Sequence, residues 1–344
     1  MLPGKMIPPN RANSSGRCSK EVKFCGLFCI IIILQMMYLH WALRRSIVSS
    51  GHHYNPSEEV YLPHASFDQI ASDIEISDAA QLLPTNGTLF CFVFTAPKYH
   101  RTRVPAVAST WLSRCDHGQF FSSKPIDDYG VFSDIFLSKE SKNAQVVLHH
   151  DIQQAAVPYS TVFKTIPDDY ELLFSKTLLA LRYTYRTYPD FDWYYKADDD
   201  TFVIVEHLRR YLDKLDPSKP HYIGYRLNKH IPRGYHSGGA GYVLSRAAMD
   251  AFDKADLYSD RKKCPPCKYE DVGIGRCLAS LNIHPKNARN AKGQTLFNPN
   301  RPDQVIQSNG SDSVAADSIS FHHLSPQQIL NLQLFTYSIE RPTK

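Results

Sequence analysis

Three consecutive carboxylates, Asp198, Asp199 and Asp200, follow an aromatic and apolar run (residues 193–197) that predicts a buried strand. Buried carboxylates are costly unless they are paired, hydrogen-bonded or bound to a cation. Where a strand leaves a sheet, this acidic triplet would form a rigid, oxygen-rich site for a hard divalent ion, which could neutralise a diphosphate leaving group. The alternative is a solvated acidic turn in which Asp200 or Thr201 caps the next helix.

A glycine-rich stretch, residues 236–244, could reach the same region. Gly238 and Gly239 allow unusual backbone conformations and let a ligand approach the chain closely. The alternative is a plain tight turn, because the pattern does not fit the dinucleotide-binding fingerprint. Ser245 is placed to cap the helix that we expect after this stretch.

Two further segments carry groups suited to the same chemistry. Glu270 and Asp271 open a predicted helix that runs to about residue 281. The helix dipole keeps an acid in the first turn ionised, as a base that acts on a sugar hydroxyl requires, although such acids are commonly only dipole partners. His322 and His323 end an apolar patch, and an imidazole near carboxylates can complete a manganese site. A structural histidine is the alternative.

The elements around these residues alternate between strand and helix. Apolar residues at helical spacing predict a helix over residues 170–188, with Lys176, Arg182 and Arg186 outside its inward face, and a second helix in which Val205 and Leu208 point inward. The predicted strands are residues 89–96, 119–122 and 191–197, with an irregular or edge strand at 129–137 and a short helix at 104–112. This order predicts an α/β fold with a mostly parallel sheet covered on both faces, whose ligands bind beyond the carboxyl ends of the strands.

The N-terminus predicts a membrane anchor. Residues 24–43 are almost unbroken apolar and long enough to span a bilayer, with five basic residues before them and Arg44–Arg45 after them. The basic excess before the span predicts an uncleaved signal anchor with a cytoplasmic tail (1–23); a cleaved signal peptide is the alternative. The composition of residues 44–85 suits a stem, and residues 86–344 would form the lumenal catalytic domain.

Charge and cysteine usage agree with a lumenal domain. The formal net charge is +5, and much of the basic excess lies in the tail, so it does not indicate nucleic-acid binding. In an oxidising lumen we expect Cys91 to pair with Cys115, and Cys277 to pair with either Cys264 or Cys267. Zinc binding is not expected, because no second CxxC or histidine pair accompanies Cys264 and Cys267. The lumenal glycosylation sequons begin at Asn86 and Asn309.

Five segments together resemble the core 1 β1,3-galactosyltransferase group of the inverting β1,3-glycosyltransferase family that includes fringe. The resemblance covers about three-quarters of the chain, from Phe90 to the C-terminus, and the order and spacing of the segments match as well. The matching segments are residues 91–97 (CFVFTAP), 109–115 (STWLSRC), 193–201 (WYYKADDDT), 237–245 (SGGAGYVLS) and 269–277 (YEDVGIGRC).

The resemblance implies a GT-A fold, a UDP-sugar donor, manganese and a Golgi membrane protein of type II topology. Asp200 matches the metal-binding acid, Asp198 lies nearer the nucleotide as a further metal candidate, and His322 matches the C-terminal metal ligand. Asp271 matches the catalytic base, with Glu270 as its rival. The nucleotide-sugar group comprises Thr95, Asp198 and Asp199, and the acceptor or donor loop contains Gly238 and Gly239.

One segment departs from the family pattern. Between residues 297–299 and His322 the core 1 enzymes carry a long aromatic loop with adjacent cysteines, whereas residues 300–319 are mostly polar and lack Trp, Tyr and Cys. That loop helps to shape the acceptor site in the family. N-acetylgalactosamine O-linked to protein is the leading acceptor, and an extended O-glycan or another donor sugar is the alternative. We expect a more open acceptor site with fewer rings.

Two other functional classes stay open at this stage. A non-catalytic, chaperone-like relative is disfavoured by the intact acidic triplet and Asp271. A lumenal glycoside hydrolase could use Asp200 and Asp271 as its two carboxylates, but it would need neither UDP nor a metal. A homodimer is left open as an alternative to a monomer.

Overall fold

The computed structural model describes residues 35, 67–127 and 156–338. Apart from Gln35, the predicted anchor lies outside these residues, as does the predicted strand 129–137. No helix in the described residues is both long and apolar enough to cross a membrane. The chain separates into two compact units, residues 1–57 and 58–344, and the fold below is that of the second unit.

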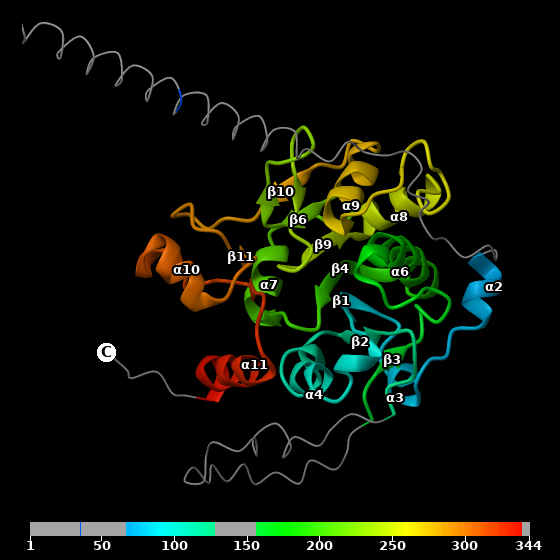
Figure 1. The fold of residues 1–344 in the computed structure, drawn as a ribbon, viewed down its shortest axis with the longest axis horizontal. Helices are drawn as coiled ribbons and strands as arrows, with labels where there is room; N and C mark the ends of the chain where they lie inside the picture. The colour runs from blue at the N-terminus through cyan, green and yellow to red at the C-terminus, as the bar shows by residue number, and fades with distance from the viewer. Residues whose placement is uncertain (1–34, 36–66, 128–155, 339–344) are drawn as a thin grey trace, which may run out of the picture. The chain divides into compact units, whose positions relative to one another are not determined.

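A seven-stranded sheet forms the centre of the described part of this unit, in the order β10-β6-β9-β4-β1-β2-β3 (Figure 1). Strands β4, β1, β2 and β3 run parallel, as do β6 and β10, while β9 is antiparallel to β4 and β6. The strands are β1 (Asn86–Phe94), β2 (His117–Phe121), β3 (Tyr159–Ser160), β4 (Asp190–Asp198), β6 (Tyr222–Gly224), β9 (Tyr242–Ser245) and β10 (Pro285–Asn287).

The mostly parallel sheet predicted from the sequence is thus confirmed, with β9 as the exception. A short antiparallel ribbon, β7 (Arg226–Leu227) and β8 (Tyr235–His236), follows β6. Since this ribbon returns the chain to the edge where β6 ends, β9 has to run back through the sheet in the opposite direction.

Alternating side chains of the central strands pack into two separate cores. Leu89, Cys91 and Val93 of β1 belong to one core, and Phe90 and Phe92 belong to the other. Helices α4 (Arg103–Ala108), α7 (Val205–Leu212) and α11 (Pro326–Gln333) contribute to the first core. Helices α6 (Leu173–Thr187), α8 (Arg246–Lys254) and α9 (Glu270–Ala279) contribute to the second. Both faces of the sheet are therefore covered, as expected for buried parallel strands.

The long predicted helix differs from the observed one at its N-terminal end. Helix α6 begins at Leu173, and Tyr170 lies in the preceding 3₁₀ turn (Tyr170–Leu172) with 77% of its surface exposed, so the prediction that the helix starts at residue 170 was wrong. Lys176, expected outside the inward face, is buried, and its Nζ lies 2.6 Å from Asp168 Oδ1. The ion pair satisfies the ammonium group, which is how a lysine can occupy a buried helical position.

Helix α7 follows the acidic triplet in the chain, and helix α8 follows the glycine-rich stretch. Helix α7 begins at Val205 with Ile204 at its N-cap, so the interpretation of Asp200 or Thr201 as a helix cap was wrong. Ser245 does cap α8, because its side chain accepts a hydrogen bond from the Ala248 amide. The predicted helix at 104–112 is shorter than expected, since α4 ends at Ala108.

A second, three-stranded sheet joins distant parts of the chain. It consists of β5 (Phe202–Val203), β12 (Ser320–Phe321) and β11 (Phe297–Asn298), and β12 is antiparallel to β5 and parallel to β11. Because Phe321 pairs with Phe202, the residue after β12 must lie beside the end of the acidic triplet. Helix α10 (Pro302–Asn309) lies between β11 and β12 in the chain and occupies the segment where the aromatic loop is absent.

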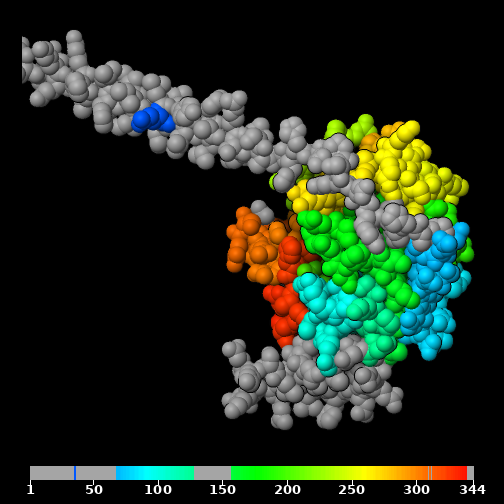
Figure 2. All heavy atoms as spheres, turned by 45° about the vertical axis from the view of Figure 1, so that its right-hand side comes forward, coloured from blue at the N-terminus to red at the C-terminus, as the bar shows by residue number. Residues whose placement is uncertain are grey.

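Residues just before β1 pack on the domain. Helices α2 (Phe67–Ser72) and α3 (Asp78–Gln81) lie within the segment predicted as a stem, and the space-filling view shows this part of the chain in light blue against the body of the domain (Figure 2). Ile70 belongs to the second core, and Ile76 forms an isolated bridge with Ser160. Folded structure therefore begins before residue 86, the residue at which the sequence predicted the start of the catalytic domain.

The disulfides resolve the choice that the sequence left open. Cys91 is bonded to Cys115, as predicted, and Cys264 rather than Cys267 is bonded to Cys277. The Sγ atom of Cys267 accepts a hydrogen bond from Arg276 at 4.0 Å. Of the sequon residues, Asn86 is exposed at the start of β1, and Asn309 is the last residue of α10.

Candidate active site

A cleft of about 600 Å³ opens at the carboxyl ends of β1 and β4. Every candidate catalytic, metal-binding, nucleotide-binding and loop residue predicted from the sequence lines it. These residues are Thr95, Asp198, Asp199, Asp200, Gly238, Gly239, Glu270, Asp271 and His322. The position agrees with the rule that ligands of such sheets bind beyond the carboxyl ends of the strands.

Asp198, the last residue of β4, is paired with a buried lysine of the same strand. Lys196 Nζ donates to Asp198 Oδ1 at 2.6 Å, and the lysine side chain is only 2% exposed. Burial by itself would lower the pKa of Lys196, but the charges of Asp198, Glu270 and Asp271 outweigh it and raise the pKa. Lys196 therefore lines the cleft and interacts electrostatically with acids of both groups.

Asp199 is the most buried member of the triplet and uses both carboxylate oxygens within the protein. Thr95 Oγ1 donates to Asp199 Oδ2 at 2.8 Å, and Arg103 Nη1 donates to Asp199 Oδ1 at 2.6 Å. Burial raises the pKa of Asp199 to about 6, although both partners oppose the shift. Arg103 also stacks on Tyr99, with 3.9 Å between the guanidinium carbon and the ring centre. Asp199 thus fixes Thr95 and Arg103 at the cleft wall.

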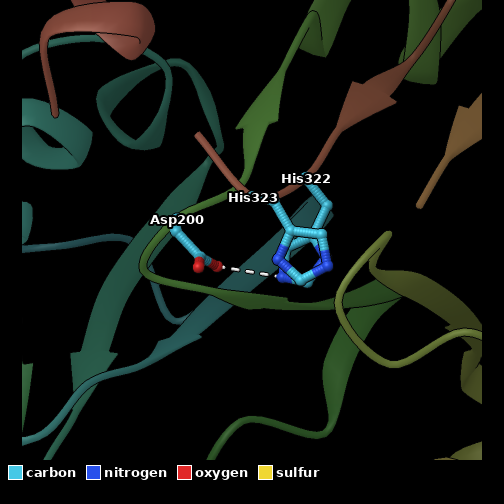
Figure 3. A group of neighbouring side chains, drawn as sticks. All are labelled: Asp200, His322 and His323. Carbon is cyan, nitrogen blue, oxygen red and sulfur yellow. Dashed lines mark ion pairs between the residues drawn. The ribbon is translucent and has the colours of Figure 1, made fainter. Parts of the chain in front are cut away.

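Asp200 faces two histidines from the far end of the chain, as Figure 3 shows. His322 Nε2 lies 3.0 Å from Asp200 Oδ1, and one donor atom each from Asp200, His322 and His323 lie within 4.8 Å of one another. Burial would raise the pKa of Asp200, but the hydrogen bond and charge of His322 and the charge of Arg103 lower it. Burial would likewise lower the pKa of His322, whereas its contact with Asp200 and the charge of Asp198 raise it.

The pairing of β12 with β5 brings His322 and His323 next to Asp200. The Leu324 amide donates to the Asp200 carbonyl at 3.0 Å, so the chain crosses directly over the acidic triplet. His323 has a left-handed backbone (φ 61°), a conformation that is uncommon outside glycine and is found at functional sites. The rings of His322 and His323 lie 3.8 Å apart, centre to centre.

Gly238 and Gly239 make room for side chains of the site. A Cβ atom on Gly239 would lie 2.0 Å from Cε1 of His322, and one on Gly238 would lie 2.4 Å from Oε2 of Glu270. The glycines were predicted to let a ligand approach the backbone. In the structure the close neighbours are protein side chains, one from each group of functional residues.

Glu270 and Asp271 have different surroundings although they are adjacent at the start of α9. Glu270 is buried, and its Oε1 accepts hydrogen bonds from Tyr242 Oη at 2.9 Å and Thr177 Oγ1 at 3.1 Å. Asp271 is half-buried, and its Oδ1 accepts from the Val272 amide at 2.8 Å. Burial raises the pKa of both acids, and Lys196 opposes the shift in both. Glu270 is therefore a fixed internal acid, and Asp271 is the more accessible one.

Several residues of the cleft escaped the sequence analysis. Arg103 and Lys196 contact the acidic groups, and Tyr170 and Tyr269 line the cleft with exposed rings. The sequence signal for Lys196 was its adjacency to predicted site residues. Arg103 carries no such signal, because its contact with Asp199 joins residues 96 positions apart.

Known proteins resemble this chain in sequence. Residues 85–333 match the Fringe-like family model. A Xenopus laevis glycoprotein-N-acetylgalactosamine 3-β-galactosyltransferase 1 is 26% identical over 77% of this chain and 70% of its own length. A Homo sapiens UDP-GalNAc:β-1,3-N-acetylgalactosaminyltransferase 1 is 26% identical over 45% of this chain and 52% of its own length. A Mus musculus β-1,3-glucosyltransferase is 24% identical over 57% of this chain and 34% of its own length.

Solved structures give a weaker likeness. A glycosyltransferase involved in glycosylation of the major capsid of PBCV-1 superposes with a TM-score of 0.40 at 11% identity, covering 72% of this chain and 100% of its own. The galactosyltransferase LgtC, solved with donor and acceptor sugar analogues, also gives 0.40, at 12% identity over 74% of this chain and 98% of its own. These scores carry no argument by themselves. The family match, which spans most of the chain, does: the chain belongs to the Fringe-like family of β-1,3-glycosyltransferases, and it is a sugar-transferring enzyme.

Proposed function

We propose that this protein is a manganese-dependent, inverting β1,3-glycosyltransferase with a GT-A fold, which moves galactose from UDP-galactose to N-acetylgalactosamine O-linked to Ser or Thr of glycoproteins. One observation carries the proposal. The same cleft holds a carboxylate–imidazole cluster around Asp200 and a second pair of acids at Glu270 and Asp271, and buried Lys196 interacts electrostatically with acids of both groups. The first group suits a metal-bound diphosphate, and the second supplies a base.

The residues around Asp200 fit a divalent ion. Their donor set combines a carboxylate oxygen with imidazole nitrogens, which suits manganese better than magnesium, since magnesium prefers six oxygen ligands. Asp200 and His322 would be the first ligands, and His323 or Asp198 could complete the set. When bound, the ion would stabilise negative charge on the diphosphate. Arg103, which lies 3.3 Å from Asp200 Oδ2, is placed to add a second positive charge at the same side.

Asp271 supports the role of base better than Glu270 does. Glu270 is held by Tyr242 and Thr177 and is buried, whereas Asp271 faces the cleft without a side-chain donor among the hydrogen bonds of the described residues. Asp271 would take the proton from the acceptor hydroxyl. That oxygen would then bond to the anomeric carbon of the donor sugar, while the bond to the UDP oxygen breaks on the opposite face and the configuration inverts.

The identities of the donor and acceptor sugars are proposed from the named relatives. The Xenopus relative is named as a 3-β-galactosyltransferase acting on glycoprotein N-acetylgalactosamine, and it covers more of the chain than the human and mouse relatives cited above. Those two relatives are named for N-acetylgalactosamine and glucose transfer, so a different donor sugar is the second candidate. A non-catalytic role receives no support from the site, because its acids are all present.

We further propose that the enzyme is a single-pass type II protein of the Golgi membrane, anchored by residues 24–43 with its catalytic domain in the lumen. The apolar run and the preceding basic residues support this placement. Two disulfides in the catalytic domain agree with an oxidising compartment.

A donor screen tests the proposed function. The full-length chain in detergent is incubated with manganese, an α-N-acetylgalactosaminyl peptide and, in separate reactions, UDP-galactose, UDP-N-acetylgalactosamine, UDP-N-acetylglucosamine or UDP-glucose. We expect transfer from UDP-galactose, a β1,3 linkage by NMR, and loss of transfer in EDTA that manganese restores. Transfer from only another donor would support the second candidate, and undiminished transfer in EDTA would contradict the metal site.

A further inference from the structure

Two exposed tyrosines line the cleft. Among the described residues, six large hydrophobic side chains are strongly exposed, and only Tyr170 (77%) and Tyr269 (44%) of these belong to the cleft wall. The other four, which lie elsewhere, are Leu82, Ile306, Leu334 and Phe335. Exposed rings grouped at a cleft are typical of a ligand-binding surface, because binding removes their apolar area from water.

The two tyrosines come from segments that are tied together. Lys268 Nζ lies 2.6 Å from Glu171 Oε1, and these residues are the immediate neighbours of Tyr269 and Tyr170 in the chain. Tyr269 is the N-cap residue of α9, and Tyr170 opens the 3₁₀ turn that leads into α6. The ion pair therefore links the two segments that carry these cleft-lining rings.

Both rings lie near the candidate base. Tyr269 precedes Glu270 and Asp271 directly. Partial desolvation at the cleft wall and the charges of Asp198, Asp271 and Glu270 raise the pKa of Tyr170, so the phenol lies within electrostatic reach of acids from both groups. The nucleotide side is built from other residues, where Arg103 stacks on Tyr99 and is held by Asp199.

We propose that Tyr170 and Tyr269 form the acceptor-binding platform of the enzyme, on which the apolar face of a pyranose ring stacks. This inference rests on the proposed function, since it assigns the acceptor of that same reaction. The attacking hydroxyl must lie beside Asp271, so the ring that carries it has to occupy the cleft next to these tyrosines. The C–H face of a hexose packs well on aromatic rings, and each phenol can also hydrogen-bond to a sugar hydroxyl.

The two tyrosines of the platform would take the role that the aromatic loop has in the core 1 enzymes. Within residues 299–319, only Pro299 and Asn300 line the cleft, and helix α10 contributes nothing to it. The sequence alone predicted a site with fewer rings for the acceptor. The structure supplies rings from the starts of α6 and α9 instead, so acceptor recognition moves from the C-terminal segment to the side of the candidate base.

Ring removal tests the platform. In the full-length chain, Tyr170→Ala and Tyr269→Ala should each raise the KM for an α-N-acetylgalactosaminyl acceptor about 3- to 10-fold, the range expected for losing one aromatic contact. The KM for the UDP-sugar should stay within about 2-fold, because the donor side is untouched. Tyr170→Phe and Tyr269→Phe keep the ring and should stay nearer the wild type. Phe335→Ala is the matched control, since this ring is 65% exposed and lies outside the cleft.

A binding measurement separates failure of the platform from failure of the proposed function. Saturation-transfer NMR in the presence of UDP and diamagnetic magnesium uses methyl α-N-acetylgalactosaminide and its β1,3-galactosylated disaccharide as probes, because paramagnetic manganese would broaden the sugar signals. We expect saturation to pass from aromatic protons to the sugar in the wild type and in Phe335→Ala, and to be lost in the double alanine variant. This readout needs no turnover. An unchanged acceptor KM in both alanine variants, an equal rise in donor KM, or saturation retained in the double alanine variant would overturn the platform, whereas no saturation of either sugar in the wild type would contradict the proposed acceptor.

Discussion

Asp271 and Glu270 are neighbours in sequence with separate tasks in the site. We expect Asp271→Asn to leave UDP-sugar binding near the wild-type value and to lower kcat by about 10²- to 10⁴-fold, the usual contribution of a positioned general base. Steady-state kinetics and donor calorimetry measure the two effects. Glu270→Gln is the comparison: an inactive Glu270→Gln beside an active Asp271→Asn would mean that the base was assigned to the wrong neighbour.

The surroundings of Asp271 also predict a pH dependence. Burial raises its pKa, and a base acts only when it is deprotonated. The rate should therefore fall as the pH drops through this raised pKa, which lies above the ordinary aspartate range, and should recover as the pH rises again. A profile of kcat/KM against pH across the acidic range measures this fall in rate. A rate that stays flat down to the ordinary aspartate range would show that Asp271 is not the base.

Asp200 is the acid on which the metal proposal depends. Its Oδ1 faces His322 at 3.0 Å, and its Oδ2 faces Arg103 at 3.3 Å. Asp200→Asn removes one charge with little change in volume, so we expect manganese and UDP affinity to fall together while the circular dichroism spectrum stays unchanged. Calorimetric titration with manganese, then with UDP in its presence, gives both values. Weakened UDP binding with normal manganese binding would place the metal elsewhere.

At the scale of elements, the glycine-rich turn before β9 separates the metal side from the acid side. Gly239→Ala would drive a methyl group to 2.0 Å from His322, a ring held by Asp200, and Gly238→Ala would approach Glu270 to 2.4 Å. We expect Gly239→Ala to weaken manganese binding at least 10-fold. Gly238→Ala should lower kcat through the displaced Glu270 while manganese affinity stays near normal.

This adjacent pair forms its own control, because both variants add one methyl group to the same turn. Manganese titration and kcat are measured for each variant beside thermal unfolding. If both variants lost the same properties in proportion to their loss of stability, the turn would act only through the fold and not through the two side chains.

Across the whole molecule, the proposed acceptor site combines an absent aromatic loop with two tyrosines from other segments. The segment after Pro299 leaves that side open, since α10 lines none of the cleft. We expect the KM for the N-acetylgalactosamine monosaccharide to be high, or an extended O-glycan with a free 3-hydroxyl on its terminal sugar to be the preferred acceptor. Side-by-side KM values with one donor test this expectation. Tight and efficient use of the monosaccharide alone would show that the missing loop matters less than its absence indicates.

Much of the fold followed from local pattern. The alternation of strands and helices predicted the parallel sheet with two covered faces, and the aromatic run before the acidic triplet predicted β4. Local reasoning was wrong where burial depends on a distant partner. Lys176 is buried only because Asp168 receives its ammonium group, and Tyr170 is exposed because the chain forms a 3₁₀ turn before α6 begins.

The amino-acid pattern indicated the chemistry available to this protein, because the acidic triplet, the Glu270–Asp271 pair and the late histidines each lie beside a recognisable element. The family resemblance assigned Asp200 and His322 to one metal site, but only the folded chain shows how these two residues meet. His322 reaches Asp200 through the pairing of β12 with β5, contacts that join residues more than 100 positions apart. Spacing along the chain carries no information about such contacts. They form because buried strand edges must satisfy their backbone hydrogen bonds, and that requirement is met only in the complete fold.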